Sequence, residues 1–148
     1  MNEVNGCNTK AVRRLLRSLL MELADLDYGA GEHRGLPFIV DARVVEYGPW
    51  GELRYIFDKV GRGVPSRSYY KIVIRYNDSD VLAMISFLRG RGVEVNTGLD
   101  ELRCTYTQLS KAVQDKLLTL FVENVYIRGN NLFMTIMIPR KGRRLEGM

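Results

Sequence analysis

Histidine and cysteine are nearly absent from this chain, and their scarcity limits the chemistry that it can support. His33 is the single histidine, and Cys7 and Cys104 are the two cysteines among 148 residues. Two cysteines cannot build a disulfide framework or a Cys-rich zinc site, and one histidine leaves a metal centre short of ligands. No recognised motif places a Ser or Cys nucleophile beside His33. We therefore expect no metal, no cofactor and no enzymatic activity.

Long apolar runs are also missing. No window approaches the ~18 uninterrupted apolar residues that indicate a transmembrane helix, and the first residues lack the pattern of a secretion signal. The chain is 46% hydrophobic and 26% charged, which is typical of a globular protein. We expect a cytoplasmic protein without membrane association and with one domain, residues 1–148, in which residues 1–8 are loose and residues 140–148 form a basic tail.

Positive charge is concentrated in two short segments. The chain has 22 Lys and Arg residues and 17 Asp and Glu residues, a formal net charge of +5. Residues 59–76 hold five basic residues and no acidic one, and residues 140–144 hold four more. Charge segregated in this way favours a polyanionic partner. Arg also outnumbers Lys by 16 to 6, and the planar guanidinium group suits phosphate and aromatic stacking.

The strongest periodic pattern lies near the N-terminus. Apolar residues from Val12 to Leu26 recur at the spacing of an amphipathic helix, and Asn8 or Thr9 can cap its start. Four basic side chains form a stripe along its first half: Lys10, Arg13, Arg14 and Arg17. Cations at this end oppose the helix dipole, so nearby acids or a partner must compensate them.

Alternating, turn-rich segments follow this helix. Strands are expected over 38–47, 53–57, 69–76, 93–96, 101–106, 124–128 and 132–138, and further helices over 78–90 and 107–121. In the 101–106 strand, Cys104 fits as a small apolar filler. Tight turns between most of the strands favour antiparallel pairing. The sequence therefore predicts an α+β fold, an antiparallel sheet of hairpins with helices packed on one face.

The strand over 69–76 alternates between two kinds of side chain. One face carries Tyr69, Lys71 and Arg75, and the other carries apolar and aromatic residues. Interleaved cations and rings suit a single-stranded nucleic acid, because cations follow the phosphates and flat rings stack on unpaired bases. The expected binding residues are Arg43, Trp50, Arg54, Arg62, Arg67, Tyr69, Lys71 and Arg75. Four other aromatic residues are expected to be ordinary core residues: Tyr55, Phe57, Tyr70 and Phe133.

Four segments of the sequence form a recognisable combination. They are the leading helix over 12–26, the strands over 38–59 and 69–76 and the closing basic run over 140–144. It resembles the single-stranded DNA-binding proteins of the Thermoproteales, the ThermoDBP family. The resemblance implies sequence-tolerant binding of single-stranded DNA in a basic and apolar cleft, during replication and repair in a thermophilic archaeon. That family forms dimers through a C-terminal helical extension, and this sequence has no heptads in which to place one, which leaves homodimer formation open.

Two other functions fit parts of the sequence. Residues 23–29 resemble the acidic helix end of LAGLIDADG homing endonucleases, in which Asp25 or Asp27 would hold a divalent metal. A regulatory factor that places its basic face on an acidic protein is the third interpretation. RNA is an alternative to DNA as the polynucleotide, because stacking and phosphate contacts serve both.

Overall fold

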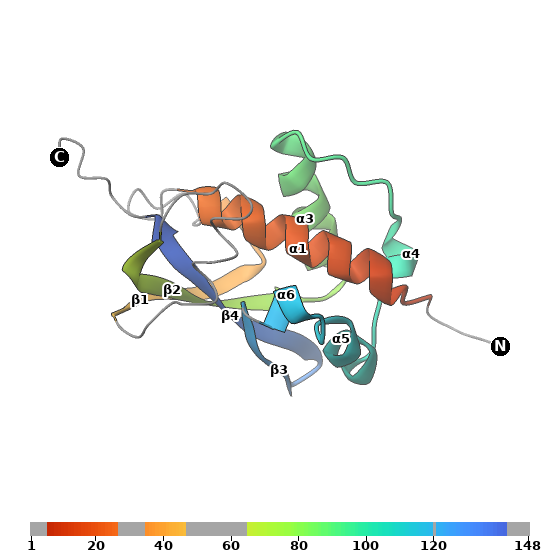
Figure 1. The fold of residues 1–148 in the computed structure, drawn as a ribbon. Coiled ribbons are helices and arrows are strands. Elements are labelled where there is room, and N and C mark those ends of the chain that lie inside the picture. Colours follow the sequence, from red (N-terminus) through yellow and green to blue (C-terminus); the bar gives the residue numbers. More distant parts are fainter. Residues whose placement is uncertain (1–5, 27–34, 47–64, 120, 142–148) are drawn as a thin grey trace.

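The computed structural model describes residues 6–26, 35–46, 65–119 and 121–141. In chain order the elements are α1 (Thr9–Asp25), β1 (Ile39–Glu46), β2 (Pro65–Tyr76), α3 (Asp78–Gly90), α4 (Leu99–Leu102), α5 (Tyr106–Ala112), α6 (Lys116–Thr119), β3 (Val122–Arg128) and β4 (Asn131–Lys141) (Figure 1). The strands form one antiparallel sheet in the order β1-β2-β4-β3. The α+β prediction is confirmed. The predicted strand over 53–57 lies outside the described residues.

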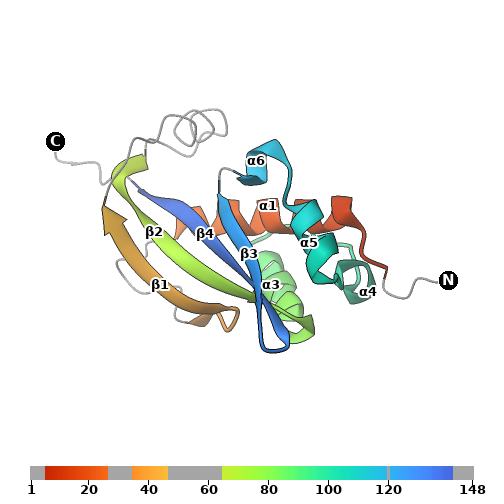
Figure 2. The ribbon, with the colours of Figure 1, turned by 90° about the horizontal axis from the view of Figure 1, so that it is seen from below.

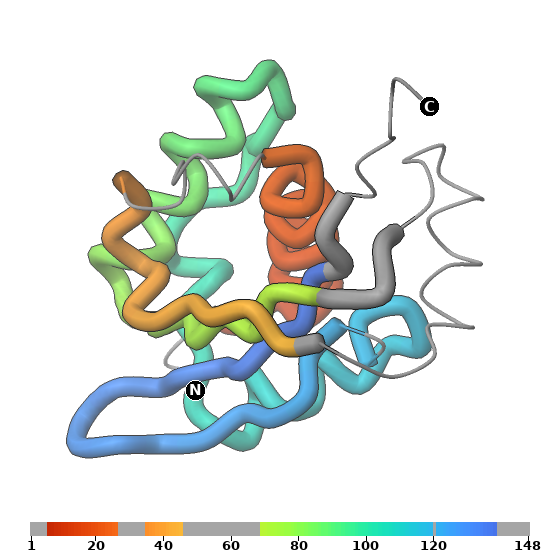
Figure 3. Tube along the Cα trace, turned by 90° about the vertical axis from the view of Figure 1, so that its left-hand side faces the viewer, coloured from red at the N-terminus to blue at the C-terminus, as the bar shows by residue number. Residues whose placement is uncertain are grey.

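Helices cover one face of this sheet. Figure 2 shows the sheet in front with α1 and α3 behind it, and Figure 3, which views α1 nearly end-on, shows the strands beneath both helices. Alternate residues of β2 point into this layer, and all of them are buried: Tyr70, Ile72, Ile74 and Tyr76. They belong to the same buried cluster as the apolar stripe of α1, in which every residue with a leucine or valine side chain from Val12 to Leu23 is buried. The core therefore lies between the sheet and α1.

The start of α1 and the turn between β3 and β4 lie where the sequence predicts them, and a local signal accounts for each. The side chain of Asn8 accepts hydrogen bonds from the backbone N–H groups of Lys10 and Ala11, both at 3.1 Å. The β3–β4 hairpin turns at Gly129, whose φ of 65° lies in the left-handed region that glycine occupies without strain. Both features depend on residues that are close together in the chain, so they can be predicted from the sequence alone.

The prediction of a hairpin over 93–106 is wrong. Residues 93–98 form neither helix nor strand, and α4 and α5 follow them. Thr105 begins α5 through a capping box, because its hydroxyl accepts from the N–H of Gln108 and the Gln108 side chain accepts from the N–H of Thr105. The single helix predicted over 107–121 is instead divided into α5 and α6 before β3 begins.

A disulfide joins Cys7 to Cys104, across a sequence separation of 97 residues. Cys104 is thus not the strand filler that was predicted. Just after Cys7, the N–H of Asn8 donates to the carbonyl oxygen of Glu101 at 2.8 Å, so residues 6–8 are held against α4 and are not loose. By chain entropy, closing a loop of this length stabilises a fold by up to about 5 kcal/mol.

Among the described residues, no helix is long and apolar enough to cross a membrane.

Candidate nucleic-acid interface

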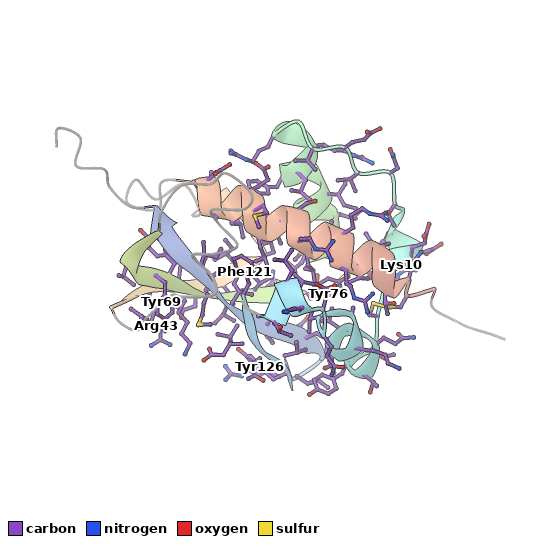
Figure 4. The ribbon with its side chains drawn as sticks, in the orientation of Figure 1. Lys10, Arg43, Tyr69, Tyr76, Phe121 and Tyr126 are labelled. Atoms are coloured by element: carbon purple, nitrogen blue, oxygen red, sulfur yellow. A yellow bond between two sulfur atoms is a disulfide. The ribbon has the colours of Figure 1, made fainter. Side chains whose placement is uncertain are left out.

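One face of the sheet points away from the helices, and we call it the outer face. Directly paired residues share a face of an antiparallel sheet, so the register defines its members. Those with described side chains are Asp41, Arg43 and Val45 of β1, Tyr69, Lys71, Val73 and Arg75 of β2, Asn131, Phe133, Thr135 and Met137 of β4, and Asn124, Tyr126 and Arg128 of β3. In Figure 4, Arg43 and Tyr126 extend from the side of the sheet opposite to α1. No described helix covers this face.

The four predicted binding residues whose side chains are described all lie on the outer face: Arg43, Tyr69, Lys71 and Arg75. The alternation predicted for β2 is therefore confirmed. Trp50, Arg54 and Arg62 lie outside the described residues, and only the backbone of Arg67 is described, within β2. Sharing a face does not make the four side chains equivalent, because their burial and partners differ.

Tyr69 is not an exposed stacking residue, and this prediction is wrong. Only 8% of its surface is exposed. β2 is an inner strand, and Tyr69 is paired with Val45 on one side and Pro139 on the other. A ring as buried as this cannot offer its flat surface to a base.

Arg75 is held by a buried carboxylate. Its Nε donates to Asp80 Oδ2 at 2.8 Å and its Nη2 to Asp80 Oδ1 at 3.0 Å, and only 1% of Asp80 is exposed. The same Nη2 donates to the carbonyl oxygen of Pro37 at 3.3 Å. The hydrogen bonds to Asp80, and then its charge, raise the pKa of the Arg75 guanidinium. Arg75 therefore joins the start of α3 to the segment before β1, and its guanidinium already has partners within the fold.

Arg43 and Lys71 remain accessible. They are paired with each other across β1 and β2. Lys71 Nζ lies 3.3 Å from Glu123 Oε1, with side chains 34% and 45% exposed, and Arg43 Nε lies 3.8 Å from Asp41 Oδ2, with side chains 67% and 54% exposed. Ion pairs at such exposure contribute about 0–1 kcal/mol. A phosphate group can therefore replace either carboxylate at little cost.

The aromatic pair on this face is Tyr126 of β3 and Phe133 of β4, which the sequence analysis missed. Their rings are stacked, with centroids 5.5 Å apart and an interplanar angle of 15°, and both residues are half-buried. Phe133 was expected in the core, and that prediction is wrong because its buried neighbours on β4, Met134 and Ile136, face the helices. The turn at Gly129 fixes the register that sets Tyr126 opposite Phe133, so this signal was present in the sequence.

The basic stripe of α1 has partners within the fold. Arg13 Nε donates to the carbonyl oxygen of Ala112 at 2.9 Å, at the end of α5, and Arg17 Nη2 lies 3.3 Å from Asp115 Oδ2. The N–H of Leu117, and then the charge of Arg17, lower the pKa of the Asp115 carboxyl. The basic stripe was expected to need acidic neighbours, and the α5–α6 connection supplies one of them, Asp115.

The possible metal ligands of the nuclease interpretation do not gather into a site within the part of the chain that the structure describes. Asp25 is the last residue of α1, and Asp27 lies outside the described residues. The described residues contain no group of three or more His, Cys, Asp or Glu side chains placed to hold a metal ion.

Comparison of the chain with protein-family models, with curated proteins and with solved structures gives no match.

Proposed function

We propose that this chain binds single-stranded DNA on the outer face of its sheet, with little preference for sequence. The observation that carries the proposal is the combination of a stacked aromatic pair with two accessible cations on one sheet face that no described helix covers. Covering single strands exposed in replication and repair is the role that such binding serves.

The aromatic pair supplies the contact to bases. Tyr126 and Phe133 are directly paired and already stacked, so binding a base requires little further ordering of the rings. Stacking of a base on an aromatic side chain contributes about 1–3 kcal/mol and tolerates any base, because every base has a flat π-face. Bases in a duplex are already stacked on each other, which excludes this contact and favours the single strand.

Arg43 and Lys71 supply the contact to phosphates. They extend from β1 and β2, on the side of β4 away from β3, and the carboxylates beside them are exposed. Their contribution is electrostatic and depends on salt, because each phosphate contact releases condensed counterions. RNA offers the same bases and phosphates, so an RNA strand of equal sequence is a necessary arm of the test.

The test is a salt series in which a short oligothymidylate, its RNA counterpart and a duplex are titrated with the chain. We expect the single-stranded DNA to bind more tightly than the duplex, with a log–log salt slope of about −0.7 per phosphate contacted. Tyr126→Leu should weaken binding by about 5-fold to 100-fold with little change of slope. Arg43→Gln should reduce the slope by about 0.7.

Matched controls exist on the helical side. Tyr106 of α5 is 41% exposed and Lys10 of α1 is exposed, so Tyr106→Leu and Lys10→Gln remove the same groups from surfaces outside the proposed site. Both should leave affinity nearly unchanged. Equal affinity for duplex and single strand, or equal effects of Tyr106→Leu and Tyr126→Leu, would contradict the proposal.

A further inference from the structure

A cavity of about 280 Å³ lies beside the disulfide. It is formed between the start of α3 and the segment that joins α4 to α5, and its lining includes Asp78, Arg103 and Cys104. Every residue that lines it belongs to the described part of the chain. One water occupies about 30 Å³ in the liquid, so the cavity is large enough for a molecule of several non-hydrogen atoms. The disulfide therefore borders a space that a small molecule can enter.

The two cysteines differ in their relation to this cavity. Cys104 lines it and Cys7 does not, although both residues are half-buried. Thiol–disulfide exchange begins when a thiolate reaches one of the two sulfur atoms, and its rate depends on access to that sulfur. Approach through the cavity therefore favours attack at Cys104, with Cys7 as the leaving group.

Contacts other than the S–S bond hold Cys7 near Cys104. The N–H of Asn8 donates to the carbonyl oxygen of Glu101 at 2.8 Å, and Asn8 Nδ2 donates to Glu101 Oε1 at 3.2 Å. Figure 1 shows α4 beside the N-terminal end of α1. These hydrogen bonds involve no sulfur, so they keep the residues around Cys7 against α4 when the S–S bond opens. A thiol held in this way has a high effective concentration, so Cys7 can re-form the bond.

We propose that Cys104 is a modification site, at which a small thiol exchanges with the disulfide while the chain stays folded. The thiolate of the small molecule attacks Cys104 Sγ and forms a new S–S bond, and the bond to Cys7 breaks with its electron pair on Cys7 Sγ. Cys7 is the resolving cysteine, because its thiolate attacks Cys104 Sγ in turn and expels the small thiolate. Alternatively, a second small thiolate attacks the sulfur of the bound one, which releases a small disulfide and leaves Cys104 reduced. This inference is independent of the proposed function.

The charges at the cavity define the class of thiol. Arg103 Nε donates to Asp78 Oδ2 at 3.0 Å, and Arg103 Nη1 donates to Asp100 Oδ1 at 2.8 Å. Two carboxylates thus share a single guanidinium, and the local excess of negative charge repels an anionic molecule. The thiol that fits is therefore small and carries no carboxylate, as an aminothiol does.

The first test asks whether exchange requires unfolding. The oxidised full chain is incubated with cysteamine, an aminothiol, over a range of urea concentrations well below the unfolding midpoint. Free thiols are trapped with N-ethylmaleimide, and mass spectrometry measures the loss of the disulfide. We expect a rate that hardly changes with urea, because the folded chain reacts. A rate that rises steeply with urea, in parallel with the population of unfolded chain, would refute the proposal.

The second test asks which sulfur reacts. Cys7→Ser leaves Cys104 as the single thiol, and the matched control Cys104→Ser leaves Cys7, so both variants lack the same disulfide. Each is treated with cystamine, the disulfide of cysteamine, in the folded state and again when unfolded in urea. We expect the ratio of folded to unfolded rate to be higher for Cys104 by about fivefold or more. Equal ratios, or a higher ratio for Cys7, would refute Cys104 as the site.

The third test concerns the class of thiol. The first test is repeated with 3-mercaptopropionate, which carries a carboxylate, and each rate is divided by the rate with the unfolded chain. The normalised rate should be about twofold to fivefold higher for cysteamine. Equal normalised rates would overturn the assigned class and leave the site in place. Circular dichroism shows whether the variants of the second test are folded, and if they are not, the urea series on the unaltered chain decides the proposal.

Discussion

The cations of α1 and those of the outer face are alike in sequence but differ in what holds them. Arg13 and Arg17 contact the α5–α6 connection, through the Ala112 carbonyl and the Asp115 carboxylate. Arg43 and Lys71 have exposed carboxylates as neighbours. The first pair joins elements of the fold, and the second is available to a ligand. Counting basic residues therefore says less about binding than asking which carboxylates and carbonyls the fold places beside them.

The largest expected effect is a loss of stability on removing the disulfide, which lies among the helices and not on the outer face. Reducing the disulfide, or replacing both cysteines by Cys7→Ser/Cys104→Ser, should lower the free energy of unfolding by about 2–5 kcal/mol, because the unfolded chain regains the entropy of a long loop. Urea unfolding with and without a reductant measures it. Binding to an oligothymidylate, tested well below the unfolding midpoint, should stay within twofold. A parallel loss of affinity would show that the outer face depends on the helical side.

The next effect separates Arg75 from Arg43, although both lie on the outer face. Arg75→Gln should lower the free energy of unfolding by about 2–3 kcal/mol, because it leaves the buried Asp80 carboxylate without its charged hydrogen-bond donor. It should not change the salt slope of binding. Arg43→Gln, the matched control, should do the opposite and leave the unfolding midpoint nearly unchanged, since Arg43 is 67% exposed. Equal salt slopes for the two variants would remove the distinction between them.

A smaller effect tests the partner of Arg17. The pKa of Asp115 is lowered from its usual 3.8, so the folded chain binds this proton less readily than the unfolded chain does. The resulting stabilisation is present above about pH 4 and is lost as the pH falls through the lowered value. Asp115→Asn should therefore cost about 0.5–1 kcal/mol near neutral pH, and the difference from the unaltered chain should shrink toward pH 2.

Unfolding curves at several pH values measure this difference. A difference of constant size across that range would mean that Asp115 acts without its charge.

The smallest effect concerns Glu123, which under the proposed function would compete with phosphate for Lys71. Glu123→Gln removes a negative charge 3.3 Å from Lys71 Nζ, so affinity for a single strand should rise by about twofold to fivefold. The control is Glu94→Gln, an exposed glutamate in the segment between α3 and α4, which should change affinity much less. A decrease in affinity with Glu123→Gln would mean that Glu123 positions Lys71 for binding.

Short-range patterns were enough to predict α1, the alternation of β2 and the β3–β4 hairpin. In each case the signal lies within a few residues, as with Asn8 at the start of α1 and Gly129 in the turn. The prediction for residues 93–119 was wrong because the short helices there depend on caps such as Thr105, which outweigh a brief apolar alternation.

Within the candidate site, the sequence could predict which face of the sheet each β2 residue occupies. It could not predict whether the side chain is accessible to a ligand. Arg75 is bound by Asp80 and Tyr69 is buried, and both facts require the tertiary arrangement. Tyr126 and Phe133 could have been found by carrying the register outward from Gly129, one pair at a time.

The bond between Cys7 and Cys104 divides the chain into a covalent ring and a tail. β1 and β2 belong to the ring, whereas β3 and β4 belong to the tail. A protease that cuts once within the ring leaves two pieces that remain one molecule until the bond is reduced, but a single cut beyond Cys104 releases a piece. Because β4 is paired with β2 along most of its length, the tail supplies an inner strand to a sheet that the ring begins, and neither part completes that sheet by itself.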